Sequence, residues 1–121
     1  MIGVAVRRMF LARAVVDMRR SYDTLISMVE GQLGMDPLSG DAFVFVGKNR
    51  QRLKVLVFER GGYWLMCRRL EQGSFALPNQ HLSKCSQDRL ELDSVTWNML
   101  LEGVKAVEVR RSKRWKPSSS A

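Results

Sequence analysis

Two stretches of the sequence carry clustered cations that could bind phosphate. The first lies near the C-terminus, where Arg110, Arg111, Lys113, Arg114 and Lys116 surround Trp115. The second comprises Lys48, Arg50 and Arg52. Lysine and arginine neutralise the phosphates of nucleic acid, and an exposed indole ring can stack on a base. These nine residues are therefore the candidate nucleic-acid-binding residues.

The overall charge agrees with a polyanionic partner. The 121 residues contain 20 lysines and arginines against 12 acidic residues, which gives a formal charge of +8. Nucleic acid is the commonest polyanion that an intracellular protein meets. A positive surface that serves only solubility would give the same composition, so charge alone leaves both interpretations open.

No catalytic constellation is recognisable. Asp36 and Asp41 flank a Pro-Gly turn, while Glu91 and Asp93 lie beside a predicted helix cap, and turn and capping preferences explain both placements. The sequence lacks the nucleophile elbow, the phosphate-cradling loop and the dinucleotide fingerprint. We expect a protein that is not an enzyme.

Metal-binding spacing is also missing. Cys67, His81 and Cys85 would leave a site one soft ligand short, and no Cys-x-x-Cys pair is present. We therefore predict no metal, no cofactor and free thiols in a reducing compartment.

The N-terminal residues resemble a twin-arginine export signal only from Val6 to Leu11. Arg13 interrupts the apolar stretch that such a signal needs, and Asp17 closes it off. The chain also lacks a window of about 20 apolar residues that could cross a membrane. We expect a cytoplasmic protein without a membrane partner.

The elements that must position the cations begin with an amphipathic helix. Apolar side chains recur at steps of three and four after Asp17, at Met18, Tyr22, Leu25, Ile26, Val29 and Leu33. Asp17 or Ser21 can cap this helix, and Gly31 and Gly34 provide its exit. The apolar stretch from Met9 to Ala12 predicts a short strand before it.

Three further apolar runs predict an antiparallel meander. They extend from Ala42 to Val46, from Leu53 to Phe58 and from Tyr63 to Leu70, and the last follows a Gly61-Gly62 turn. Strand alternation gives the meander two partly apolar faces. We expect the first helix on one face, and the Phe75 to Pro78 segment, a second helix or a partner protein on the other.

A second helix is predicted after Asp93 and Ser94. Trp97, Leu100, Leu101 and Val104 follow at helical spacing, with Gly103 near the end, and Trp97 is expected to pack in the core. The sequence thus predicts an α+β fold: a small single domain over residues 1–109, with a central antiparallel meander and two helices. Residues 110–121 are expected to form a flexible basic tail.

Several ordered sequence blocks resemble a known family. The blocks are Val16-Asp17-Met18-Arg19-Arg20 with Asp23 and Leu25, Asp36-Pro37-Leu38-Ser39-Gly40 with Phe43-Val44-Phe45, Arg52-Leu53-Lys54-Val55-Leu56, Arg69-Leu70-Glu71-Gln72-Gly73-Ser74-Phe75 and Leu77-Pro78. Together they resemble the small TnpB accessory proteins, the second open reading frame product of the insertion-sequence family numbered sixty-six. The similarity covers Met9 to Pro78 and weakens towards Gly103.

The resemblance implies a transposition accessory protein encoded beside a larger transposase. Three positions depart from the family pattern: Ser21 replaces a common glycine, Val57-Phe58 stands where aromatic pairs are frequent, and Leu77 replaces a usual tryptophan. None of these departures removes a known catalytic residue.

Two roles fit the resemblance and the charge. In the first, which we favour, the protein binds DNA through the C-terminal cations and the cations from Lys48 to Arg52. In the second, the meander docks onto the transposase of the same element and the basic surface tolerates nearby DNA. A regulatory role on RNA would use the same cations, and the sequence leaves the oligomeric state open.

Overall fold

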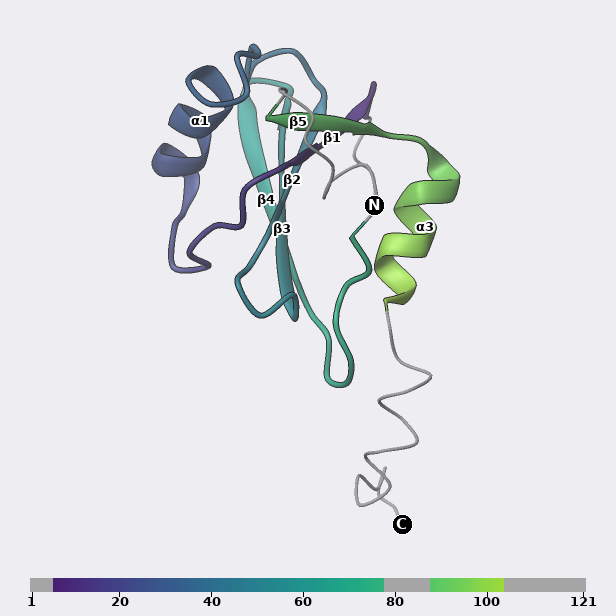
Figure 1. The fold of residues 1–121 in the computed structure, drawn as a ribbon. Helices are drawn as coiled ribbons and strands as arrows, with labels where there is room; N and C mark the ends of the chain where they lie inside the picture. The colour runs from purple at the N-terminus through teal and green to yellow at the C-terminus, as the bar shows by residue number, and fades with distance from the viewer. Residues whose placement is uncertain (1–5, 78–87, 104–121) are drawn as a thin grey trace.

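The protein folds around a five-stranded mixed sheet. The computed structural model describes residues 6–77 and 88–103. The strands are β1 (Met9–Ala12), β2 (Ala42–Val46), β3 (Arg52–Glu59), β4 (Gly62–Arg69) and β5 (Arg89–Leu92), and they lie side by side in the order β4-β3-β2-β1-β5. The helices α1 (Tyr22–Glu30) and α3 (Ser94–Glu102) lie on opposite sides of this sheet (Figure 1). The predicted α+β class is confirmed.

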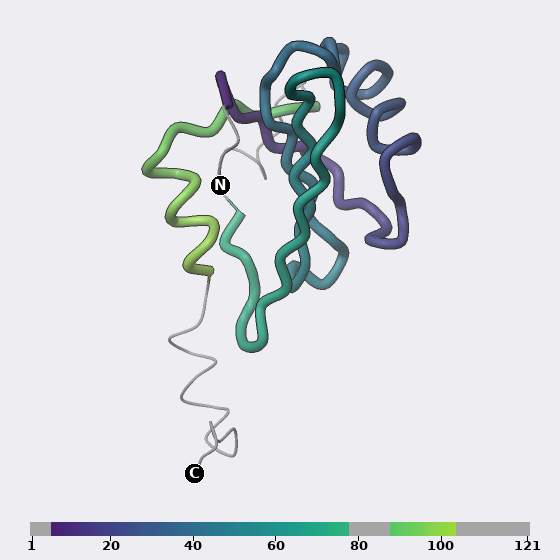
Figure 2. The backbone as a smooth tube through the Cα atoms, turned by 180° about the vertical axis from the view of Figure 1, so that it is seen from behind, coloured from purple at the N-terminus to yellow at the C-terminus, as the bar shows by residue number. Residues whose placement is uncertain are grey.

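The predicted meander forms β2, β3 and β4. Each strand pairs antiparallel with the next, and Figure 2 shows the long β3–β4 hairpin from behind. The tight turn is Arg60-Gly61, with φ of 52° and 82°, as a two-residue hairpin turn with two left-handed residues requires. The expected Gly61-Gly62 turn is therefore wrong by one residue, because Gly62 is already the first residue of β4.

The other half of the sheet departs from a simple meander. The predicted strand Met9–Ala12 is confirmed as β1, and it pairs parallel to β2 and antiparallel to β5. Leucine and charged side chains alternate in β5, which the sequence analysis did not identify as a strand. The sheet is consequently mixed, and its first and last strands are neighbours.

Each face of the sheet buries its own apolar cluster, as the alternation of β3 predicts. On the α1 face the buried side chains are Phe10, Ala12, Val16, Leu25, Val29, Leu33, Phe43, Phe45 and Leu56. On the α3 face they are Leu11, Ala42, Val44, Val46, Leu53, Val55, Val57, Phe75, Leu92 and Leu100. Phe75 and α3 share the second face, so both predicted covers are present.

The helix caps differ in quality. Ser21 is the N-cap of α1, but its side chain makes no capping hydrogen bond. The Asp93 carboxylate caps α3 by accepting a 2.8 Å hydrogen bond from the backbone amide of Thr96. Trp97 is half-buried against the core, in line with the predicted packing role. The predicted domain end at residue 109 lies outside the described residues.

Candidate nucleic-acid interface

The β2–β3 loop presents three of the predicted cations at one end of the sheet. Lys48, Arg50 and Arg52 are exposed, and none has an acidic partner within ion-pair distance among the residues that the structure describes. The loop is a tight turn, because the amide of Arg50 donates to the carbonyl of Gly47 at 2.9 Å. Arg50 has a φ of 59°, a conformation that side chains other than glycine adopt at a cost.

A neighbouring segment holds this loop in place. The amides of Leu70 and Phe75 donate to the carbonyls of Gln51 and Arg50, at 2.8 and 2.6 Å. The ring of Phe75 is buried, so these bonds join the loop to the core. The cations therefore project from a fixed backbone, which reduces the entropy that a ligand must remove.

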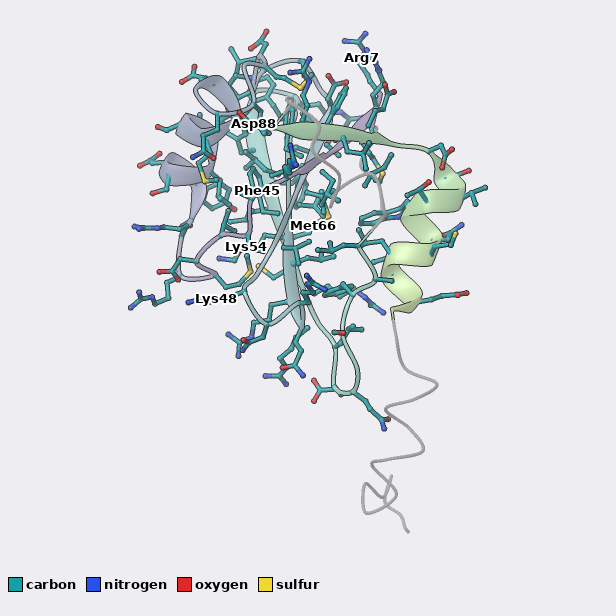
Figure 3. All side chains as sticks on the ribbon, in the orientation of Figure 1. Arg7, Phe45, Lys48, Lys54, Met66 and Asp88 are labelled. Atoms are coloured by element: carbon teal, nitrogen blue, oxygen red, sulfur yellow. The ribbon has the colours of Figure 1, made fainter. Side chains whose placement is uncertain are left out.

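Further cations lie at the same end of the sheet. The register places Arg69 opposite Arg52 and Arg68 opposite Leu53. Figure 3 shows Arg7 at the top of the molecule and Lys48 well below it, with Lys54 in between. Lys54 has a structural role, because its ammonium donates to the carbonyl of Arg20 at 2.6 Å. That bond ties the segment before α1 to β3. We call the resulting set the basic end: Arg19, Arg20, Lys48, Arg50, Arg52, Arg68 and Arg69.

Two acidic side chains moderate the basic end. Glu71 accepts from Arg69 at 2.9 Å, and Asp17 accepts from the Arg19 guanidinium at 2.7 Å. The hydrogen bonds from the side chain of Arg19, and then from its backbone amide, hold the pKa of the Asp17 carboxyl well below its usual range. The Arg19 side chain is 91% exposed, so screening by solvent leaves this pair little stabilising value.

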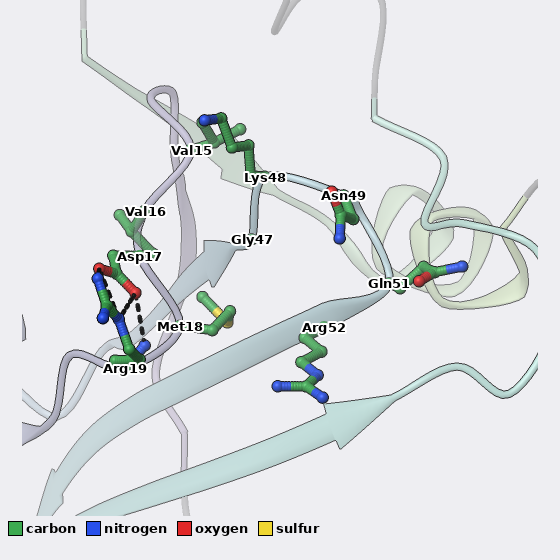
Figure 4. A pocket seen from close by; sticks show the side chains of 10 residues that line it. All are labelled: Val15, Val16, Asp17, Met18, Arg19, Gly47, Lys48, Asn49, Gln51 and Arg52. Carbon is green, nitrogen blue, oxygen red and sulfur yellow. Dashed lines mark hydrogen bonds and ion pairs between the residues drawn. The ribbon is translucent and has the colours of Figure 1, made fainter.

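A pocket of about 500 Å³ opens beside the loop (Figure 4). Its lining combines apolar side chains, amides and cations: Val15, Val16, Asp17, Met18, Arg19, Gly47, Lys48, Asn49, Gln51 and Arg52. The backbone amide of Val16 donates to the carbonyl of Val46 at 3.0 Å, which holds one wall against the end of β2. The basic end thus contains a hollow as well as a charged surface.

The structure brings together only some of the predicted site residues. Lys48 and Arg50 lie in the β2–β3 loop and Arg52 is the first residue of β3, so these three cations are close together as expected. The C-terminal candidates Arg110, Arg111, Lys113, Arg114, Trp115 and Lys116 lie outside the described residues. Sequence reasoning missed Arg19, Arg20, Arg68 and Arg69. Pairing the strands outward from the hairpin turn would have found Arg68, because register alone places it beside Leu53.

The described residues contain no group of three or more His, Cys, Asp or Glu side chains that could hold a metal ion. Cys67 is exposed and makes no disulfide, whereas His81 and Cys85 lie outside the described residues. Asp36 serves its turn by accepting from the amide of Leu38 at 2.9 Å. Within the described part of the chain, no helix is long and apolar enough to cross a membrane.

Comparison with known proteins agrees with the sequence blocks. The protein described as "Uncharacterized protein y4jC" of Sinorhizobium fredii (strain NBRC 101917 / NGR234) is 29% identical over 114 residues, which cover 94% of this chain and 93% of that protein. "Uncharacterized protein y4hO" of the same strain is 35% identical over 72 residues, covering 60% of this chain and 63% of that protein. No solved structure matches significantly. The family model described as "IS66 Orf2 like protein" matches residues 7–111. The chain therefore belongs to the IS66 Orf2-like family, and its role is that of an accessory protein in the transposition of an insertion sequence.

Proposed function

We propose that the protein is a non-catalytic accessory factor that binds DNA through its basic end. The observation that carries this proposal is the β2–β3 loop, where Lys48, Arg50 and Arg52 are exposed without a described acidic partner. Cations that contact phosphates release counterions, which gives affinity for any DNA sequence.

The position at which the chain leaves α3 also supports DNA binding at the basic end. Gly103, the last described residue, packs on the carbonyl of Ser74, which precedes the residue bonded to the β2–β3 loop. Arg110 follows after a short stretch of sequence that spans at most about 25 Å when fully extended. The C-terminal cations therefore begin within reach of a DNA segment that contacts the loop.

The decisive experiment is a fluorescence-anisotropy titration of a labelled element-end duplex and a scrambled duplex over a range of salt concentrations. We compare two doubly substituted variants of equal charge. Lys48→Ala with Arg50→Gly should lower the slope of log affinity against log salt by about two. Arg7→Ala with Arg60→Gly, at the opposite end, should leave that slope unchanged. Absence of binding by the native protein at low salt would overturn the proposal.

The C-terminal cations require a separate variant. Reversing the charges of Arg110, Arg111, Lys113 and Arg114 to glutamate should weaken DNA binding beyond the effect of the loop variant. If both groups of cations contact phosphates, the losses of DNA affinity in the loop variant and in the C-terminal variant should add when the two variants are combined. Unchanged affinity after reversal would remove the tail from the interface and leave the loop as the binding element.

A second candidate function is docking onto the transposase. Strand β4 is at the edge of the sheet, and its Trp64 side chain is 50% exposed while its indole N–H donates to Glu59 at 3.0 Å. Nearby, an apolar groove of about 260 Å³ lies between the hairpin and α3, lined by Leu53, Val55, Met66, Cys67, Arg68, Trp97 and Leu101. An extended segment of the transposase could add to the free edge of β4.

One variant separates the two functions. Trp64→Ala removes the exposed indole at a distance in sequence from the β2–β3 loop. The docking function predicts weaker binding of the purified transposase in a pull-down, with unchanged DNA affinity. The DNA-binding function predicts no change in either measurement, since Trp64 does not belong to the basic end.

A further inference from the structure

The pocket beside the β2–β3 loop has a floor that depends on one glycine. A Cβ atom at residue 47 would lie 2.6 Å from the Cγ atom of Met18. Gly47 therefore lets Met18 pack directly against the backbone, and any side chain at residue 47 displaces Met18, which lines the pocket. The backbone of Gly47 is further fixed, because its amide donates to the carbonyl of Arg52 at 2.9 Å.

The walls are held by bonds that do not involve a ligand. On one side, Asp17 accepts from both the side chain and the backbone amide of Arg19. On the other side, the amide of Arg50 closes the turn onto Gly47. Both walls are therefore formed in the protein on its own, and about 500 Å³ is within the range of pockets that hold small ligands.

Three chemistries meet in this pocket. Lys48 and Arg52 supply positive charge, and the Asp17 carboxylate of the lining is engaged by Arg19. Val15 and Met18 supply apolar surface, and Asn49 supplies an amide. Figure 4 shows the Asn49 amide on the loop between Gly47 and Gln51. A bare phosphate would use only the cations. A nucleotide uses all three, because its base presents a flat apolar face and an edge of hydrogen-bonding groups.

Whether a base can enter the pocket depends on whether the nucleic acid is a duplex or a single strand. A base inside a duplex is stacked on both faces and paired along its edge, so it cannot enter a hollow unless it is flipped out. An unpaired base has its faces free. The size and lining of the pocket therefore favour a single strand over a duplex of equal charge.

We propose that this pocket binds one unpaired nucleotide of a single strand, with the base on Met18, its edge on Asn49 and its phosphate on Arg52, while Lys48 beside Val15 contacts the adjoining part of the strand. This inference rests on the proposed DNA-binding function and deepens it by naming the form of the ligand. One strand then makes two kinds of contact with the basic end: its phosphates lie over the exposed cations, and one of its bases lies in the pocket.

The test compares single and double strands of one sequence, with 2-aminopurine in the single strand as the fluorescent base. Gly47→Ala displaces Met18 from its place in the pocket lining without changing any charge. Gly62→Ala is the matched control, because a Cβ there meets no atom within 4 Å. We expect Gly47→Ala to lower single-strand affinity about tenfold, by analogy with the loss of one stacked base. Duplex affinity should not change, and Gly62→Ala should match the native protein.

Asn49→Ala provides a second variant for the case in which Gly47→Ala fails to fold, since Asn49 is an exposed turn residue. It should weaken single-strand binding several-fold and leave duplex binding intact. Equal affinity for both forms, with no effect of either variant, would overturn the pocket while DNA binding stands. Binding of neither form would overturn both proposals. A single-stranded RNA of the same sequence completes the set: if only RNA binds, the pocket stands and the DNA function fails.

Discussion

The two ends of β3 carry hairpin connections that solve the same backbone problem with the same residue type. At one end Arg50 has a φ of 59°, and at the other Arg60 has a φ of 52°. Glycine or asparagine usually occupies such positions, because a side chain in the left-handed region crowds the backbone. Neither arginine is therefore explained by the turn geometry that it adopts.

The surroundings of the two turns differ. Arg60 lies 3.9 Å from the carboxylate of Glu59, and a Cβ at Gly61 or Gly62 would meet nothing within 4 Å. The β2–β3 loop, in contrast, is bonded to Leu70 and Phe75 and lies against Met18. Both connections of β3 contain an arginine in the left-handed region, but tertiary contacts make only the β2–β3 loop a fixed surface with a pocket.

The largest expected effect is a difference in the free energy of unfolding between a substitution packed near the β2–β3 loop and one in the β3–β4 turn. Gly103→Ala should lower the free energy of unfolding by about 3 kcal/mol, because residue 103 combines a φ of 72° with a ψ of −172° and touches the carbonyl of Ser74. Gly61→Ala, with a φ of 82° and open space, should cost about 1 kcal/mol. Urea denaturation measures both. Equal losses would show that the packing of Gly103 near the loop contributes nothing.

A smaller effect should have the opposite sign from most substitutions. Asp17→Asn removes the anion that engages Arg19 at the rim of the pocket, yet asparagine can still accept from the backbone amide of Arg19. Freed Arg19 should raise DNA affinity about threefold at low salt. Glu91→Gln frees Arg8 away from the loop and should leave affinity unchanged. Anisotropy measures both, and a rise in both variants would point to net charge instead of a site.

The ion pair between Arg8 and Glu91 should contribute to the stability of the protein in a pH-dependent way. The hydrogen bond from Arg8 lowers the pKa of Glu91 below its ordinary value. A carboxyl with a lowered folded-state pKa stabilises the protein above its unfolded pKa, and this contribution disappears as pH falls through the folded pKa. Arg8→Ala should therefore lose less stability than the native protein between pH 5 and pH 3. Parallel pH profiles in thermal melts would show that the pair is too exposed to contribute.

The smallest expected effect is the most direct comparison of the turns. Arg50→Gly and Arg60→Gly relieve the same unfavourable φ and add the same flexibility to the unfolded chain, so each should change stability by less than about 1 kcal/mol. Their DNA affinities should differ, with only Arg50→Gly weaker. If both variants bind DNA as the native protein does, the phosphate contacts of the loop must come from Lys48 and Arg52 alone.

Local patterns predicted the elements better than their arrangement. The limits of Met9–Ala12 and Ala42–Val46 were predicted correctly, because apolar runs between turns mark strands. The expectation of an antiparallel sheet holds for β2, β3 and β4 but not for the β1–β2 pair, which is parallel. Periodicity along one strand says nothing about the direction of its neighbour, and β5 is too short for its alternation to stand out.

The sequence predicted only the part of the candidate site that is formed by residues close together in the chain. Lys48, Arg50 and Arg52 are adjacent in sequence, so their clustering was visible without a fold. The pocket required Met18 to pack on Gly47, a contact between segments that are distant in sequence. DNA binding by either group of cations stays a prediction.

The position of β1 between β2 and β5 also constrains the order of folding. The meander closes through contacts between consecutive strands, but the Arg8–Glu91 bond joins residues that are 83 positions apart. Contacts at such separation form late, because closing the long intervening chain costs entropy. During synthesis the edge of β1 must wait for β5 to leave the ribosome. We expect β5 amides to exchange with deuterium faster than those of β3, and equal protection would show that the sheet closes in one step.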